Sequence, residues 1–233
     1  MIDLYCERLG PGLLAEPLNA ISNAAFLVAA WWLWRLAKPG RGTWGRPSVE
    51  GRAEDAADPG LLVLAVLALA IGVGSTLFHT LATGWALASD VIPILLFQLL
   101  VLLLYLRRRA RLATVPALGL CVAFLLACLA GRSFSGQLNG SLAYAPTVAV
   151  LALLAWHQHR CGHQPTLGWA FGLFSLSLTL RSIDNILCPL WPTGTHLFWH
   201  LLNAVVLVLS GMAVLGTGRL SGGNNEGQTA GQR

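Results

Sequence analysis

GLLVLAVLALAIGVGSTLFHT, residues 60–80, is a continuous run without a single Asp, Glu, Lys or Arg. An α-helix needs about 20 apolar residues to cross the hydrocarbon core of a bilayer. Because every backbone group in lipid must be hydrogen-bonded within the chain, such a run must be helical. The stretch therefore predicts a membrane-spanning helix, and its last turns carry two polar side chains, Ser75 and His79.

Comparable apolar runs occur along the whole chain, seven in all, at residues 19–37, 60–80, 86–106, 112–130, 141–157, 166–187 and 195–216. The 233 residues are 55% hydrophobic and 11% charged, whereas about a quarter of the residues of a soluble domain are charged. We therefore predict an all-α integral membrane protein, with a seven-transmembrane-helix bundle over residues 1–217. Residues 218–233 are polar and Gly-rich, and we expect them to be disordered.

The basic residues are concentrated on one side of these runs. One side holds Arg8 and Arg132. The other side holds Lys38, Arg41, Arg46, Arg52, Arg107, Arg108, Arg109, Arg111, Arg160, Arg219 and Arg233. Cytoplasmic loops of membrane proteins are enriched in Lys and Arg, so we expect the N-terminus outside and the C-terminus in the cytoplasm. Basic loops beside anionic lipid account for the net charge of +5, and no nucleic-acid partner is expected.

Five polar residues fall at one depth of this topology, near the outer leaflet. Ser75 and His79 lie at the outer end of the second run, Asp90 lies in the first turns of the third, and His196 and His200 lie in the first turns of the seventh. Ionisable side chains inside a bilayer are costly and point to a functional site. Ser75 and His79 are four residues apart, as are His196 and His200, so the two members of each pair lie on the same helix face.

Three histidines with one carboxylate and one hydroxyl match the needs of a zinc hydrolase. Three protein ligands leave a fourth position open, as in catalytic zinc sites, and zinc lowers the pKa of a bound water to about 7. Each residue also has a structural interpretation. The histidines could be core residues, Ser75 could bond its own helix backbone, and Asp90 could be a helix cap after Ser89.

Two further polar groups have simpler explanations. Arg181 and Asp184, three apart in the sixth run, predict a buried ion pair, although Asp184 could also support a ligand histidine. His157, His159, Cys161 and His163 resemble a metal-binding tract, but an interfacial cytoplasmic loop explains them as well.

The chain has five cysteines. Cys6 precedes the first run and Cys188 follows the sixth, so both fall on the outer side. An oxidising compartment would allow these two to form a disulfide.

Several of these segments together resemble the alkaline ceramidases, within the wider group of seven-helix membrane zinc hydrolases that includes the adiponectin-receptor-like proteins. The segments are YCERLGPGLLAEPLNAISNAAF (5–26), GVGSTLFHTL (72–81) with Asp90 after it, RSIDNILC (181–188) and THLFWH (195–200). They occur in the family's order and cover nearly the whole chain.

The resemblance implies a role for each polar residue. His79, His196 and His200 would be the zinc ligands, Asp90 would hold and help deprotonate the water, and Ser75 would steady the oxyanion. Cys6 and Cys188 match the family's disulfide positions.

A calcium site in the N-terminal segment is also implied, with Glu7, Glu16 and the carbonyl of Tyr5 at matching positions. The family's Asp and Asn are replaced by Leu4 and Leu9, and Asp3 lies one place from the first of them.

We therefore expect a zinc-dependent amidohydrolase that cleaves the N-acyl bond of ceramide-like lipids to a fatty acid and a sphingoid base. One alternative is a hydrolase of another N-acyl or ester lipid. The other is a non-enzymatic seven-helix receptor or transporter. The Ala-, Leu- and Arg-rich composition favours a bacterial inner membrane, with an internal eukaryotic membrane as the alternative. The sequence does not specify an oligomeric state.

Overall fold

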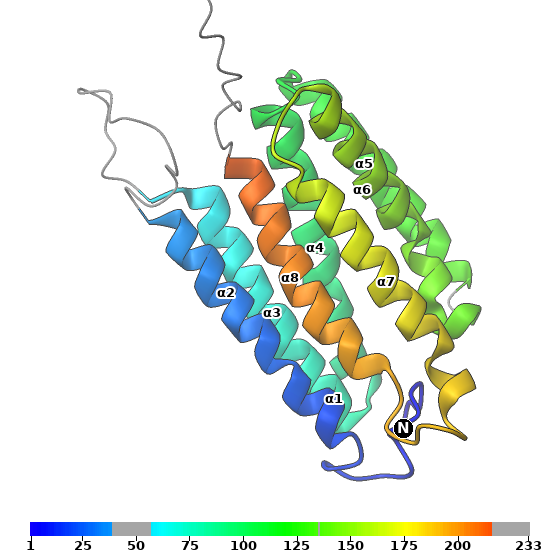
Figure 1. Cartoon of the computed structure of the whole chain (residues 1–233). Helices are drawn as coiled ribbons and strands as arrows, with labels where there is room; N and C mark the ends of the chain where they lie inside the picture. The colour runs from blue at the N-terminus through cyan, green and yellow to red at the C-terminus, as the bar shows by residue number, and fades with distance from the viewer. Residues whose placement is uncertain (39–56, 135, 216–233) are drawn as a thin grey trace, which may run out of the picture.

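The computed structural model describes residues 1–38, 57–134 and 136–215, and in these ranges every regular element is a helix (Figure 1). The elements are α1 (Pro17–Ser22), α2 (Ala24–Ala37), α3 (Pro59–Leu81), α4 (Gly84–Arg108), α5 (Thr114–Gly131), η1 (Arg132–Phe134), η2 (Leu138–Tyr144), α6 (Ala145–Arg160), α7 (Thr166–Leu187) and α8 (His196–Leu215). The prediction of an all-α chain is confirmed. The predicted tail and most of the basic loop after Lys38 lie outside the described residues.

Six stretches in the described ranges are long and apolar enough to cross a membrane: Pro17–Ala37, Pro59–Leu81, Gly84–Arg108, Thr114–Phe134, Leu138–Arg160 and His196–Leu215. Six such helices suggest a multi-pass membrane protein. The predicted span at 166–187 is a helix, α7, but it is not among the six because Arg181 and several hydroxyl residues lower its apolar character. The count of seven spans and the orientation of the termini therefore stay predictions.

The first apolar run is divided into two helices. α1 ends at Ser22 and α2 begins at Ala24, with Asn23 between them. The Asn23 side chain donates to the carbonyl of Asn19 at 2.9 Å. At the break this carbonyl therefore accepts from a side chain, in the place of the helical backbone N–H four residues later. α1 is short and bears Asn19, which is fully buried.

Helix α3 has clear signals at both ends. The Asp58 carboxylate accepts hydrogen bonds from the backbone N–H groups of Gly60 at 2.8 Å and Leu61 at 3.2 Å, and Pro59 occupies the first turn, as is common at helix starts. At the other end Ala82 adopts a left-handed conformation with φ 47°, which lets the chain turn directly into α4.

The helices form a single elongated bundle in which α8 lies between the α2–α3 pair and α7 (Figure 1). α3 packs against both α2 and α4, and α8 packs against α7 and α2. The turn from α3 to α4, the connection from α7 to α8 and the N-terminal segment all lie at one end of the bundle (Figure 1). This arrangement brings together three segments that are far apart in the sequence.

Candidate metal centre

Three histidines from two helices converge at this end of the bundle. His79 lies in the last turn of α3, and His196 and His200 lie in the first turns of α8. Each is only 1% exposed, and their candidate ligand atoms all lie within 4.8 Å of one another. Among the described residues they form the only such group of three or more His, Cys, Asp or Glu side chains.

Hydrogen bonds to the outer ring nitrogens define which atoms face inward. The Nδ1 of His79 lies 2.5 Å from Glu16 Oε2. The Nδ1 of His200 lies 2.7 Å from Ser22 Oγ, and this hydroxyl donates its own proton to the carbonyl of Asn19. Both Nδ1 atoms therefore donate, because a carboxylate and a hydroxyl that already donates can only accept.

Two unprotonated nitrogens then face each other across the site. The Nε2 atoms of His79 and His200 are 3.2 Å apart, and with the protons on Nδ1 neither can donate to the other. The Nδ1 of His196 is buried and has no hydrogen-bond partner among the described residues. Facing lone pairs and an orphaned nitrogen need a cation, so the donor set fits a metal ion. Imidazole ligands supported by carboxylates are typical of zinc sites.

The Glu16 carboxylate supports this centre from outside the first ring of ligands. It accepts from Arg8 Nε at 2.5 Å and from the Asn19 side chain at 3.1 Å, in addition to His79. Burial opposes ionisation, but the hydrogen bonds from His79, Asn19 and Arg8 outweigh it and hold the pKa of Glu16 below its usual value. An ionised Glu16 fixes the orientation and the tautomer of His79.

Ser75 and Asp90 form a second polar group beside the histidines. Ser75 lies one turn before His79 and is 2% exposed, and its hydroxyl lies near the Asp90 carboxylate. Gly74 brings the two helices together, since a Cβ at this position would lie 2.0 Å from the carbonyl oxygen of Ser89.

The alternative that Asp90 caps a helix is wrong. α4 begins at Gly84 with Thr83 as its N-cap, so Asp90 lies inside the helix. The backbone of Asp90 lies where α4 approaches Gly74 of α3.

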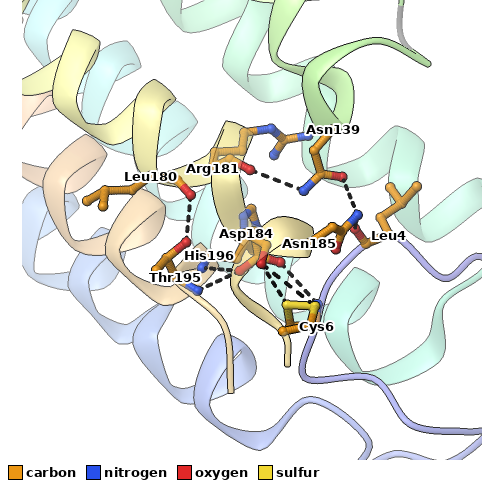
Figure 2. The surroundings of a disulfide bond; sticks show 10 residues. Leu4, Cys6, Asn139, Leu180, Arg181, Asp184, Asn185, Thr195 and His196 are labelled. Atoms are coloured by element: carbon orange, nitrogen blue, oxygen red, sulfur yellow. Dashed lines mark hydrogen bonds between the residues drawn. A yellow bond between two sulfur atoms is a disulfide. The ribbon is translucent and has the colours of Figure 1, made fainter. Parts of the chain in front are cut away.

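Asp184 fixes the start of α8, where two of the histidines lie (Figure 2). Its Oδ1 accepts from the backbone N–H groups of Thr195 at 2.5 Å and His196 at 2.9 Å, and its Oδ2 accepts from Cys6 at 3.0 Å. Asp184 thus contacts His196, a predicted ligand, through the backbone, and its support of a metal ligand stays a prediction. Gly194, with φ +67°, allows this approach, because a Cβ there would lie 2.2 Å from Asp184 Oδ1.

The predicted ion pair between Arg181 and Asp184 is wrong. The Arg181 side chain points away from Asp184 (Figure 2), and its guanidinium lies over the rings of Tyr5, Tyr144 and Trp199. The spacing of three residues places both on one side of α7, but the three backbone donors already satisfy the Asp184 carboxylate.

The predicted disulfide between Cys6 and Cys188 is present, with the two Cα atoms 5.3 Å apart. It joins the N-terminal segment to the end of α7 across 182 residues of sequence. Next to Cys6, the ring of Tyr5 is stacked on His196 with ring centroids 3.5 Å apart. The disulfide therefore holds an aromatic side chain directly against one of the histidines.

The residues considered for calcium do not converge on one point. Both Glu7 oxygens accept from backbone N–H groups at the start of α1, from Leu18 at 2.6 Å and Asn19 at 2.8 Å. Asp3 is exposed, and the carbonyl of Tyr5 accepts from the backbone N–H of Arg8 at 3.2 Å. Calcium needs six to eight oxygen ligands, so these side chains do not fit it in the arrangement described.

Arg8 is the residue of this region that sequence reasoning missed. It is 4% exposed and also donates from Nη2 to the carbonyl of His79 at 2.7 Å. The available signal was its position between Glu7 and Glu16 on the side that has few cations. The predicted alternative metal tract at His157, His159, Cys161 and His163 does not form a metal-binding group among the described residues. His157 Nδ1 lies 3.0 Å from the hydroxyl of Tyr105.

The all-helical fold with six membrane-length helices suggests a multi-pass membrane protein, and the buried group of three histidines at one end could bind a metal ion. A sequence model of the family described as Ceramidase matches residues 9–220. The chain therefore belongs to the ceramidase family, which supports a ceramide-hydrolysing function and a lipid substrate. Searches of curated proteins and of solved structures found no match.

Proposed function

We propose that this protein is a zinc-dependent amidohydrolase that cleaves the N-acyl bond of ceramide-like lipids, releasing a fatty acid and a sphingoid base. The observation that carries the proposal is the pair of facing Nε2 atoms, 3.2 Å apart, in a buried group of three histidines whose ligand atoms lie within 4.8 Å of one another. Membership of the ceramidase family supports the choice of substrate.

His79, His196 and His200 would hold the zinc ion, leaving one position for water or substrate. When bound, zinc polarises a carbonyl group and lowers the pKa of a water molecule. The protein's own contribution is to fix the three imidazoles. Glu16 and Ser22 each bond the Nδ1 of one imidazole, that of His79 and that of His200. Asp184 fixes the backbone of the third ligand by accepting from the N–H of His196.

Asp90 and Ser75 would handle protons and developing charge. The Asp90 carboxylate accepts a proton from the attacking water and later delivers it to the leaving amine nitrogen. Ser75 donates a hydrogen bond to the carbonyl oxygen of the amide as that oxygen gains negative charge. The close approach of α3 and α4 at Gly74 supports the placement of both groups beside the histidines.

A narrow apolar cavity of about 80 Å³ next to the site would receive the start of the acyl chain. Its lining includes Phe26, Ile71, Phe97 and Trp199. Phe26 and Trp199 each also contact a ring of the histidine centre. Apolar side chains at this point favour a long hydrocarbon chain over a polar acyl group.

In the proposed topology the N-terminus and the metal centre lie at the outer leaflet and the C-terminus lies in the cytoplasm. The positions of Lys and Arg on the two sides support this orientation. We propose a bacterial inner membrane from the Ala-, Leu- and Arg-rich composition. The outer side of such a membrane permits the disulfide between Cys6 and Cys188.

Metal content and hydrolysis of the purified protein test this function. We expect about one zinc per chain, loss of zinc in His196→Ala or His200→Ala, and release of fatty acid from ceramide. Asp90→Asn should keep the zinc and lower kcat by about 10²–10⁴-fold, the usual contribution of general acid–base catalysis. The absence of metal from the wild type would contradict the proposal. Faster release from esters or other N-acyl lipids would change the substrate and keep the chemistry.

A further inference from the structure

A second, larger cavity lies beside the metal centre and has a different chemical character. Its volume is about 470 Å³, and it lies between α4, α5, α7 and the η2 segment. Two of its lining side chains, Arg132 and Arg181, are charged, and both are cationic. Among the described residues that line it, there is no Asp or Glu.

Arg181 is the buried member of this pair. It is 8% exposed, and its guanidinium lies 5.3 Å from the ring of Tyr5, 5.6 Å from Tyr144 and 5.0 Å from Trp199. The hydroxyl of Tyr5 contacts the guanidinium, but Nε has no hydrogen-bond partner among the described residues. Aromatic faces attract a cation but supply no hydrogen-bond acceptor for its N–H groups.

Two aromatic side chains lie between Arg181 and the metal centre. Tyr5, which lies under Arg181, is stacked on His196, and the ring of Trp199 lies parallel to His196 with centroids 6.5 Å apart. The carboxylate that acts on Arg181 electrostatically is Asp90, which also lies near Ser75. A group bound at Arg181 would therefore lie next to the reacting atoms.

We infer that Arg181, with Arg132, forms a subsite for an acidic group of the lipid that is bound at the metal centre. The inference rests on the proposed function and adds to it. A buried guanidinium with an unsatisfied N–H is costly and gains most from an anion.

Two sources can supply this acidic group. It can belong to the head group of the substrate, as the carboxylate of an N-acyl amino acid does, or it can be the carboxylate of the fatty acid that hydrolysis releases. Two lipids that differ only in this group distinguish the sources. N-palmitoylglycine carries a carboxylate where N-palmitoylethanolamine carries a neutral hydroxymethyl group, and free palmitate represents the product.

The experiment compares the wild type, Arg181→Gln and Arg181→Lys in full-length protein. We expect the ratio of kcat/KM for the acidic amide to that for the neutral amide to fall about tenfold to a hundredfold in Arg181→Gln, the effect of losing a hydrogen-bonded charge. Arg181→Lys should keep part of the ratio. If the ratio in Arg181→Gln equals that of the wild type but inhibition by palmitate weakens about tenfold to a hundredfold, the subsite takes the product's carboxylate.

Controls separate binding from folding. Arg160→Gln is the matched control, because Arg160 also lies over a ring, that of Trp156 at 5.6 Å, but is remote from the cavity. It should change neither the kcat/KM ratio nor the inhibition by palmitate. If Arg181→Gln does not fold, Arg132→Gln, which changes an exposed residue, should lower the ratio in the same direction. A purely structural Arg181 would lower the melting temperature and leave both the ratio and the inhibition constant as in the wild type, and this result would overturn the inference.

A binding measurement separates this inference from the proposed function. With zinc removed by a chelator, N-palmitoylglycine should raise the melting temperature more than N-palmitoylethanolamine, and Arg181→Gln should abolish the difference. If the protein hydrolyses neither amide, the proposed function fails and the binding result still decides the subsite. Equal shifts with both lipids in the wild type, together with unchanged kinetics in Arg181→Gln, would contradict the subsite alone.

Discussion

The histidine-bearing helices and the pair formed by α5 and α6 differ sharply in how much of each is covered by protein. In the apolar stretches of α3 and α8, 50% and 56% of the residues are buried, against 17% in Thr114–Phe134 and 11% in Leu138–Arg160. The first pair carries the metal centre, and the second presents mostly apolar side chains outward. Burial on several sides fixes the position of a helix, so the ligands lie on the helices that can move least.

The largest effect should come from removing the carboxylate that fixes the start of α8. Asp184→Ala leaves the backbone N–H groups of Cys6, Thr195 and His196 without an acceptor. We expect a loss of at least about 4.5 kcal/mol in the free energy of unfolding, since three hydrogen bonds to a charged group are lost and each contributes about 1.5–3 kcal/mol. Thr179→Ala, an exposed residue of the same helix, is the control for chemical denaturation and should stay within about 0.5 kcal/mol of the wild type.

A pair of glycine substitutions tests the difference between the two helix pairs directly. At Gly74 of α3 an added Cβ would lie 2.0 Å from the Ser89 carbonyl oxygen, whereas at Gly119 of α5 nothing lies within 4 Å. Gly74→Ala should cost about 1–3 kcal/mol through overpacking and lower the zinc content. Gly119→Ala should be neutral or stabilising by up to about 1 kcal/mol. Similar thermal stabilities of the two variants would contradict the described packing of α3 on α4.

Arg8 provides a test that acts through the metal rather than through the fold. Arg8→Met removes the hydrogen bonds to Glu16 and to the His79 carbonyl, so Glu16 should hold His79 less firmly. Outer-shell changes of this type cost about 10–100-fold in metal affinity, which competition with a zinc chelator measures. Added calcium should restore neither affinity nor activity, because Glu7 and Glu16 are engaged elsewhere. Restoration by calcium would show that the predicted calcium site exists.

The smallest effect is expected at the opposite end of α3. Asp58 caps this helix and accepts two hydrogen bonds from Arg108, at 2.6 and 3.0 Å. Burial raises the pKa of Asp58, but Arg108 and the backbone N–H groups outweigh it, so the pKa lies below its ordinary value of 3.8. A lowered pKa stabilises the fold above the unfolded-state value, and this contribution is lost as the pH falls through the folded-state value.

Asp58→Ala should therefore cost about 1 kcal/mol at neutral pH, the usual effect of losing an N-cap. The difference from the wild type should shrink as the pH falls below about 4. Zinc content should not change, because the residue is remote from the histidines. A difference in unfolding free energy that is independent of pH would mean that Asp58 acts without its charge.

Much of the fold could be predicted because apolar length alone identifies helices in lipid. All seven runs are helices, and the spacing of four residues between His196 and His200 placed them on one face of α8. The break at Asn23 was not predicted, because it depends on a side chain that bonds the backbone within an otherwise apolar run.

The side-chain partners of the site were harder to predict than its ligands. Arg181 and Asp184 have the spacing of an ion pair, but the sequence does not show that Asp184 meets the backbone at the start of α8. Arg8 was taken as a topology charge, and its contact with Glu16 exists only because the N-terminal segment folds back over α3. Spacing defines a face within one helix, whereas these contacts depend on which segments the bundle brings together.

X-ray diffraction at the zinc absorption edge, on crystals of the full-length protein grown in lipid, tests the central claim most directly. The account predicts a single strong anomalous peak among the Nε2 atoms of His79 and His200 and the ring of His196. No zinc peak at this position, or zinc bound only to the His157–His163 segment, would contradict it.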